Sequence, residues 1–190
     1  DELLTRARGN LQIPEDNWYF GTNPFGVKQT TWSSYRAARS DILSYNDNLS
    51  SCTAVFDARA DNLLVFIDRI AKDVGALSAT IKNRAEANDA GWFDTRADNL
   101  FWQSKGMLYA YYGIVVAARH DFRDVIETRA LTDIWNRVEE QLRTAIELEP
   151  PIVSNGSEDA LFMPSHLTVA GFYVLRIRTN LVEMRDILRN

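Results

Sequence analysis

The residue types that perform most protein chemistry are scarce in this chain. Its 190 residues include two histidines, His120 and His166, and one cysteine, Cys52. Neither histidine has a glutamate three residues before it, as the Glu-x-x-His helices of di-iron proteins do. No glycine-rich phosphate loop, zinc-protease motif or serine-nucleophile motif occurs in the sequence. We therefore expect no catalytic residue, no metal site and no cofactor, and we expect that the protein is not an enzyme.

One group of side chains has a spacing that suits a binding site. Trp102, Lys105, Tyr109 and Tyr112 fall at i, i+3, i+7 and i+10, which places them on one face of a helix. Aromatic rings beside an ammonium group can line a pocket for an anionic or amphipathic ligand. In the alternative interpretation, the rings pack in the core and the lysine reaches past them to water.

A second candidate region is the Pro- and Gly-marked loop over residues 150–166. Ser165 is suited to cap the helix that follows, and the free N–H groups at that helix start could receive an anion or a partner carboxylate. Asn155 and His166 are the candidate binding residues, because both side chains can donate and accept hydrogen bonds. In the alternative, Asn155 only makes a turn and His166 only caps or packs.

Composition narrows the class of protein. Hydrophobic residues make up 46% and charged residues 25%, which is ordinary for a folded protein. The net charge of −5, with acids and arginines interleaved, argues against a nucleic-acid partner. The single cysteine excludes a disulfide framework. The uncharged stretch Gly106–Ala118 falls short of the roughly 20 residues that a membrane span needs, and the first residues do not resemble a signal peptide.

A heptad pattern dominates residues 31–85, which contain no proline. Apolar or small residues recur there at steps of three and four: Tyr35, Ala38, Ile42, Tyr45, Leu49, Cys52, Phe56, Ala60, Leu63, Ile67, Ile70, Val74, Leu77 and Ile81. Two successive steps of four at residues 52, 56 and 60 form a stutter. The pattern predicts one long helix whose apolar stripe, with Cys52 buried on it, faces the rest of the domain and not a second chain. The polar residues Ser44 to Ser51 are the weak point, where the helix could break into two.

Three further helices are expected. Residues 97–118 are apolar on almost every side, which is typical of a central helix. A third helix should follow a corner near residue 120 and end before Pro150, and the last should begin after Ser165. Residues 1–30 are predicted to be an irregular lead-in and residues 31–190 a single α-helical domain. The predicted fold class is all-α: an antiparallel helical bundle of four or five helices built around one long helix.

Several short motifs in a fixed order carry a family resemblance. They are Ala60-Asp61-Asn62-Leu63-Leu64, Gly91-Trp92-Phe93, residues 105–112, Val153-Ser154-Asn155-Gly156 and residues 161–167. With these motifs the chain resembles, over residues 30–190, the bacterial family catalogued as domain of unknown function 2333. The resemblance implies a protein of Gram-negative bacteria with an N-terminal membrane segment and most of its chain outside the cytoplasm, of which this chain would be the C-terminal part. It supplies no catalytic residues.

These observations favour a non-enzymatic protein-interaction or scaffold domain of a bacterial envelope protein. We expect a protein partner, no nucleic acid, and a periplasmic domain tethered to the inner membrane only through a segment absent from this chain. The alternative is a binding module for a small apolar or anionic ligand between helices. The sequence leaves the oligomeric state open.

Overall fold

The computed structural model describes residues 2–12, 31–87, 95–155 and 165–190. Seven α-helices account for most of these residues, and the described residues form no strand beyond one isolated bridge between Asn155 and Ser165. The predicted all-α class is therefore confirmed. The chain divides into two compact units, Asp1–Asp57 and Ala58–Asn190.

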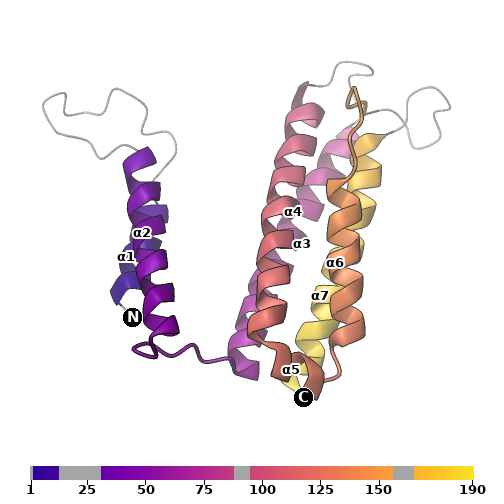
Figure 1. The fold of residues 1–190 in the computed structure, drawn as a ribbon. Helices are drawn as coiled ribbons and strands as arrows, with labels where there is room; N and C mark the ends of the chain where they lie inside the picture. Colours follow the sequence, from indigo (N-terminus) through magenta and orange to yellow (C-terminus); the bar gives the residue numbers. More distant parts are fainter. Residues whose placement is uncertain (1, 13–30, 88–94, 156–164) are drawn as a thin grey trace, which may run out of the picture. The chain divides into compact units, whose positions relative to one another are not determined.

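The first unit is a helical hairpin of α1 (Glu2–Leu11) and α2 (Thr31–Ser50), which pack against each other (Figure 1). Two predictions need correction here. Residues 2–11 are helical, so the segment 1–30 is not irregular throughout, and α2 groups with this hairpin although residues 31–190 were predicted to be one domain. The only buried side chains among its described residues are small: Ala7, Ser34 and Ala38.

The predicted single long helix is not formed: the chain leaves the helix after Ser50, inside the polar segment Ser44 to Ser51 where a break into two helices was the alternative, and α3 (Ala60–Ala87) starts only beyond the stutter. Cys52 adopts a left-handed conformation with φ 57°, and the Thr53 N–H donates back to the Asn48 carbonyl at 2.9 Å. This is the six-to-one hydrogen bond of a Schellman helix end. The Ser51 and Thr53 hydroxyls also donate to the Asn48 carbonyl, so polar side chains complete the stop. Cys52 is consequently exposed, contrary to its predicted burial.

The second unit is an antiparallel bundle of four long helices and one short one. α3 packs along α7 (His166–Arg189), α7 against α6 (Thr132–Ile146), and α6 against α4 (Thr95–Asp121), while α3 and α4 touch more lightly. The short α5 (Arg123–Thr128) turns the chain from α4 into α6 at one end of the bundle (Figure 1). This arrangement confirms the predicted bundle of four or five helices.

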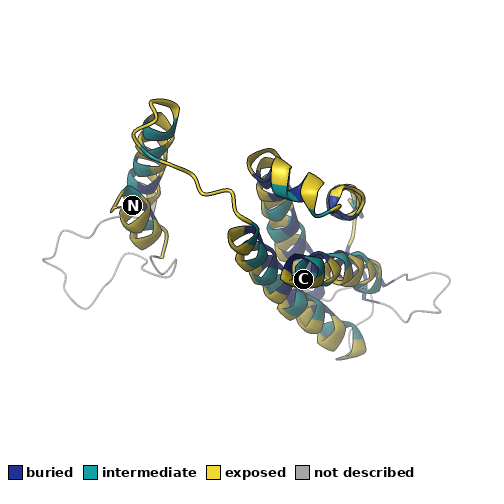
Figure 2. Ribbon diagram, turned by 90° about the horizontal axis from the view of Figure 1, so that it is seen from below, coloured by how far each residue is buried: buried dark blue, intermediate teal, exposed yellow. Residues whose placement is uncertain are grey.

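The apolar stripe of α3 faces the inside of this bundle, as predicted. Ile67, Ile70 and Val74 are buried within a single chain, so they need no second copy to cover them. They meet the buried faces of the other helices, which include the fully buried Trp135 of α6 and Ile177 of α7. In Figure 2 the buried parts of the bundle helices, in dark blue, lie on the sides that face the other helices of the bundle. The core therefore fixes α3 and α7 side by side.

α4 is not the central helix that its composition predicted. It buries one side, including Phe101, Leu108 and Val115, and leaves its opposite side to solvent. That outer side exposes large apolar residues: Trp102, Tyr109, Ile114 and Val116. A ring of four long helices gives each helix only two close neighbours, so a helix that is apolar all round has an uncovered face. None of the helices in the described ranges is long and apolar enough to cross a membrane.

Candidate functional site

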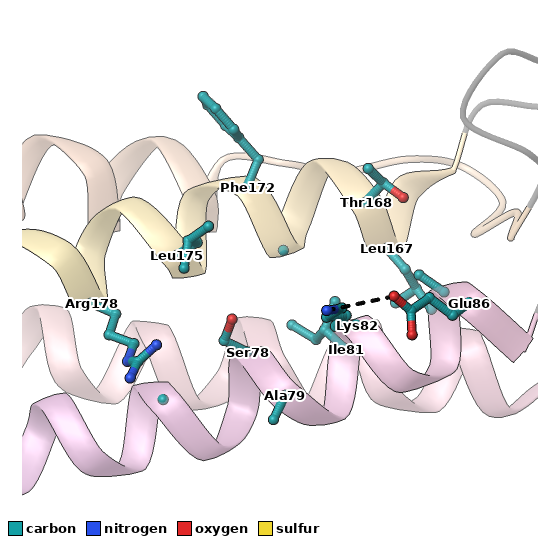
Figure 3. Close-up of a pocket in the computed structure, with 13 residues that line it drawn as sticks. Ser78, Ala79, Ile81, Lys82, Glu86, Leu167, Thr168, Phe172, Leu175 and Arg178 are labelled. Atoms are coloured by element: carbon teal, nitrogen blue, oxygen red, sulfur yellow. Dashed lines mark ion pairs between the residues drawn. The ribbon is translucent and has the colours of Figure 1, made fainter.

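A groove between α3 and α7 has a volume of about 870 Å³. Figure 3 shows its lining residues, which come from Gly75–Glu86 of α3 and from Leu167–Arg178 of α7. Ile81 and Leu167 form part of its floor, and both are buried. Phe172 and Leu175 line it from α7 and are half exposed, at 54% and 50%. The groove is therefore apolar and open to solvent.

Small residues create the groove. On α3, Gly75, Ser78 and Ala79 recur at three- and four-residue steps, and Gly171 faces them from α7. A Cβ atom at Gly171 would lie 3.2 Å from Cγ2 of Ile81, which is tighter than ordinary van der Waals contact. A Cβ atom at Gly75 would lie 3.1 Å from Nε of Arg178. Glycine at these two positions thus permits the close packing of α3 on α7 and leaves room for the arginine side chain.

The two cationic side chains that line the groove differ in whether a carboxylate lies beside them. Lys82 lies 3.7 Å from Glu86, one turn further along α3. Arg178, by contrast, has no carboxylate partner among the described residues. Arg178 is exposed, and together with Gly75 it also lines a smaller adjoining hollow of about 260 Å³. One end of the apolar groove therefore offers a guanidinium group that is available for an acidic ligand.

The cations beyond Arg178 are already neutralised. Lys72 contacts the Asp68 carboxylate at 2.6 Å, and the hydrogen bond from Lys72 lowers the pKa of Asp68. Arg185 lies 3.6 Å from Asp68 and 2.9 Å from Asp186. Arg178 is thus set apart from its neighbours along this seam by lacking such a partner.

The four residues predicted on α4 do share one side of the helix, but they do not line the groove. The Lys105 ammonium lies 5.2 Å from the centre of the Trp102 ring and donates to the Leu148 carbonyl at 3.2 Å and to Glu149 at 2.9 Å. The hydrogen bond from Lys105 also lowers the pKa of Glu149. Lys105 therefore ties α4 to the chain just beyond α6. Tyr109 is 68% exposed, whereas Tyr112 packs against the core.

Asn155 and His166 lie together where the chain enters α7. The Ser154 N–H donates to Nδ1 of His166 at 3.1 Å, and the His166 N–H donates to the Ser154 carbonyl at the same distance. Asn155 is fully buried, and its amide donates to the Arg84 carbonyl near the end of α3 at 3.2 Å. These contacts form a clasp between the loop, α3 and α7. Both side chains thus make hydrogen bonds within the protein, and their role in binding stays a prediction.

The cap predicted at Ser165 is present. Its hydroxyl accepts a hydrogen bond from the Thr168 N–H at 3.2 Å and another from the Thr168 hydroxyl at 2.9 Å. The first N–H groups of α7 are therefore partly satisfied within the protein. Across the described ranges, no three His, Cys, Asp or Glu side chains are grouped closely enough to hold a metal ion.

Sequence reasoning missed the groove itself. Its best signal was the pair of glycines inside helical stretches, Gly75 and Gly171. A glycine in a helix interior costs about 1 kcal/mol relative to alanine, but Gly106 and Gly113 also lie inside a helix and have nothing packed against them, so this signal does not single out the groove. The pairing of these two glycines across α3 and α7 depends on helix order in the bundle, which neither glycine reveals alone.

Comparison with known protein families gives a match over most of the chain. A family described as uncharacterised proteins conserved in bacteria, domain of unknown function 2333, matches residues 5–90 and 81–190. No curated protein and no solved structure is significantly similar to the chain.

Proposed function

The chain belongs to this family of uncharacterised bacterial proteins, and from that premise we propose that it is a non-enzymatic protein-interaction domain. The observation that carries the proposal is the open, apolar groove of about 870 Å³ between α3 and α7. Its occupant is an amphipathic helix of a protein partner. Exposed apolar surface beside a preformed groove is the usual setting for helix-in-groove recognition.

The dimensions and charge of the groove define this partner. The lining of α3 runs from Gly75 to Glu86, which is about 16 Å at 1.5 Å per residue, or three helical turns. A helix with apolar side chains at i, i+3 or i+4, and i+7 could cover Phe172 and Leu175. Because Arg178 lacks a carboxylate partner among the described residues, a partner helix with an acid at that end is favoured.

Two designed helical peptides test the groove. Both carry the same apolar positions, and they differ by a glutamate or a lysine at the position that meets Arg178. We expect calorimetry to show that the glutamate peptide binds roughly tenfold more tightly, and that Arg178→Glu reverses this preference. Arg123→Glu, at an exposed arginine of α5, is the matched control. Equal binding of the two peptides, or binding by neither, would contradict the proposal.

A steric pair of variants separates the groove from the rest of the bundle. Ala79→Trp fills the groove at an exposed position, whereas Ala76→Trp places the same side chain on α3 outside the lining. Only Ala79→Trp should block peptide binding. A photo-crosslinking amino acid at position 79, used in living cells, should then capture the natural partner, and the same amino acid at position 76 should not.

A small amphipathic anion is the second candidate for the same groove. The volume lies within the range of small-molecule sites, and an apolar floor with one cation suits an aliphatic carboxylate. Dodecanoate is a suitable probe. If it binds the protein, loses affinity with Arg178→Glu and cannot be displaced by either peptide, the ligand-binding module replaces the protein-interaction domain as the function.

The location forms a further part of the proposal. The family resemblance supports a domain on the periplasmic side of the inner membrane, tethered by a segment outside this chain. Fusions of the full-length protein to alkaline phosphatase and to β-galactosidase check this location. Phosphatase activity without galactosidase activity is expected, because alkaline phosphatase needs the oxidising periplasm to form its disulfides. The reverse pattern would exclude a periplasmic domain.

A further inference from the structure

The α1–α2 hairpin carries an exposed apolar surface of its own. On α2, Trp32 is 65% exposed, and Tyr35, Ile42 and Leu43 are also exposed. Trp32 and Leu43 lie on the side of α2 that is turned away from its buried residues, Ser34 and Ala38, and Tyr35 and Ile42 lie between that side and the buried one. We call this surface the α2 outer face. From Trp32 to Leu43 it extends about 16 Å along the helix.

Positive charge lies within this apolar surface. Arg36 and Arg39 are exposed on the same side of α2, and the Arg36 guanidinium stacks 3.4 Å from the centre of the Trp32 ring. Neither arginine has a carboxylate partner among the described residues. Asp41 does not oppose this charge, because its side chain is mostly covered and binds Arg6 of α1 at 2.6 Å. The α2 outer face is therefore apolar and positively charged at once.

We propose that the α2 outer face lies on a lipid surface that contains anionic headgroups. Trp32, Tyr35, Ile42 and Leu43 would enter the boundary between headgroups and acyl chains, and Arg36 and Arg39 would pair with lipid phosphates. Aromatic residues with an apolar body and a polar tip favour this boundary, and each arginine near an anionic surface raises the affinity about fivefold. The contact is separate from the groove, which lies in the other unit and takes a different occupant.

Lipid is favoured over an acidic protein by the shape of the surface. The exposed apolar side chains follow the outside of a single helix of a two-helix hairpin, which presents a convex strip. A convex amphipathic helix can sink into a bilayer surface without a complementary cavity. Asp47, the next acid on this side, comes one turn beyond Leu43 and leaves the strip itself free of acids.

Vesicle binding by the whole chain tests the proposal. The probes are vesicles of phosphatidylcholine alone and vesicles that also contain phosphatidylglycerol, compared by cosedimentation at low and high salt. We expect binding to the anionic vesicles only, weakened by salt. The double variant Arg36→Glu with Arg39→Glu should lose at least roughly tenfold in affinity, and Trp32→Ser with Leu43→Ser should also abolish binding. All four positions are exposed, so these changes leave the hairpin packing intact.

Control variants make the result decisive. Val65→Ser and Arg123→Glu change an exposed apolar residue and an exposed arginine in the bundle, and both should bind anionic vesicles like the original chain. Asp47→Asn removes the nearest acid and should strengthen binding. The proposal is overturned if both kinds of vesicle bind equally, if neither binds, or if Arg123→Glu weakens binding as much as the α2 variants do. Capture by soluble polyglutamate without vesicle binding would assign the face to an acidic protein and would also overturn it.

Discussion

The two units of this protein use their apolar residues in opposite ways. The hairpin of α1 and α2 buries only small side chains among its described residues, Ala7, Ser34 and Ala38, and exposes its large ones. The bundle buries large side chains from four helices, with Trp135 completely covered. Each fully buried large apolar side chain contributes about 1.5–3 kcal/mol to folding. Stability therefore resides mainly in the bundle, and the hairpin keeps its large apolar residues available for contact.

The largest expected difference between the units concerns their tryptophans. Trp135→Ala should lower the free energy of unfolding of the bundle by about 3–5 kcal/mol, because it leaves a large cavity. It also removes the Nε1 donor to Glu139 at 3.1 Å, while Arg119 still binds that carboxylate. Trp32→Ala in the hairpin should change the stability by no more than about 0.5 kcal/mol. Urea denaturation followed by circular dichroism measures the free energy of unfolding of both variants. Similar losses from Trp135→Ala and Trp32→Ala would contradict the difference between the two units.

A helix cap gives the next largest effect. Ser165→Ala should destabilise the bundle by about 1 kcal/mol, because the Thr168 N–H loses its acceptor at the start of α7. The same substitution at Ser44, an exposed position inside α2, should leave the unfolding transition of the bundle unchanged. Thermal and urea unfolding of the two variants check this pair. A loss at Ser44 that matched the loss at Ser165 would show that the hairpin and the bundle unfold as one cooperative unit.

Two left-handed residues allow a smaller and closely matched comparison. Ala130, with φ 53°, ends α5 as Cys52 ends α2, and the Leu131 N–H donates back to the Ile126 carbonyl at 2.9 Å. Glycine suits this conformation better than alanine, so Ala130→Gly should raise the stability of the bundle by about 0.5 kcal/mol. Cys52→Gly should not move the unfolding midpoint of the bundle. An equal rise in the unfolding midpoint of the bundle with both variants would indicate that the two units unfold as one cooperative unit.

The smallest effect at neutral pH belongs to Tyr111, which links α4 to α3. Burial, together with the hydrogen bond to Asp73 at 2.9 Å, raises the pKa of Tyr111 from 10.0 to about 12. Since the unfolded chain ionises first, the contribution of this residue is complete below pH 10 and is lost as the pH rises towards 12. Urea midpoints measured at rising pH should fall in this window, and Tyr111→Phe should make the fall shallower. If the urea midpoint of Tyr111→Phe falls with pH as steeply as that of the original chain, other groups cause the loss of stability at alkaline pH.

Much of the bundle could be predicted from the sequence, because apolar residues recur along its helices at regular steps of three and four. The stripe of Leu63, Ile67, Ile70 and Val74 predicted burial within one chain, and Ser165 predicted a cap. The polar residues Ser44 to Ser51 indicated where the long helix could break, and α2 does end at Ser50. The form of the helix end was harder to predict, because ends of this left-handed type usually carry glycine, whereas Cys52 and Ala130 hold the conformation here.

The candidate site was only partly predictable, because the sequence does not reveal which helices are neighbours. The spacing of Trp102, Lys105 and Tyr109 correctly indicated a shared side of α4, but the partners of Lys105 come from Leu148 and Glu149, more than forty residues away. Asn155 and His166 were predicted as a pair. Their hydrogen-bond partners, the Arg84 carbonyl and the Ser154 N–H, became known only from the structure. Arg178 stood out only after α3 and α7 were placed side by side.

The chain between α2 and α3 exposes Val55 at 85% and also Phe56. Exposed stretches outside regular secondary structure are the preferred substrates of proteases, and an aromatic residue is a common cleavage position for one class of them. A cut after Phe56 would leave every buried residue of the bundle in place, since all of them lie beyond Ala58. The released fragment would keep the groove and lose α2 with Arg36 and Arg39. Cleavage of this one peptide bond would therefore place the α2 outer face and the groove between α3 and α7 on two separate molecules.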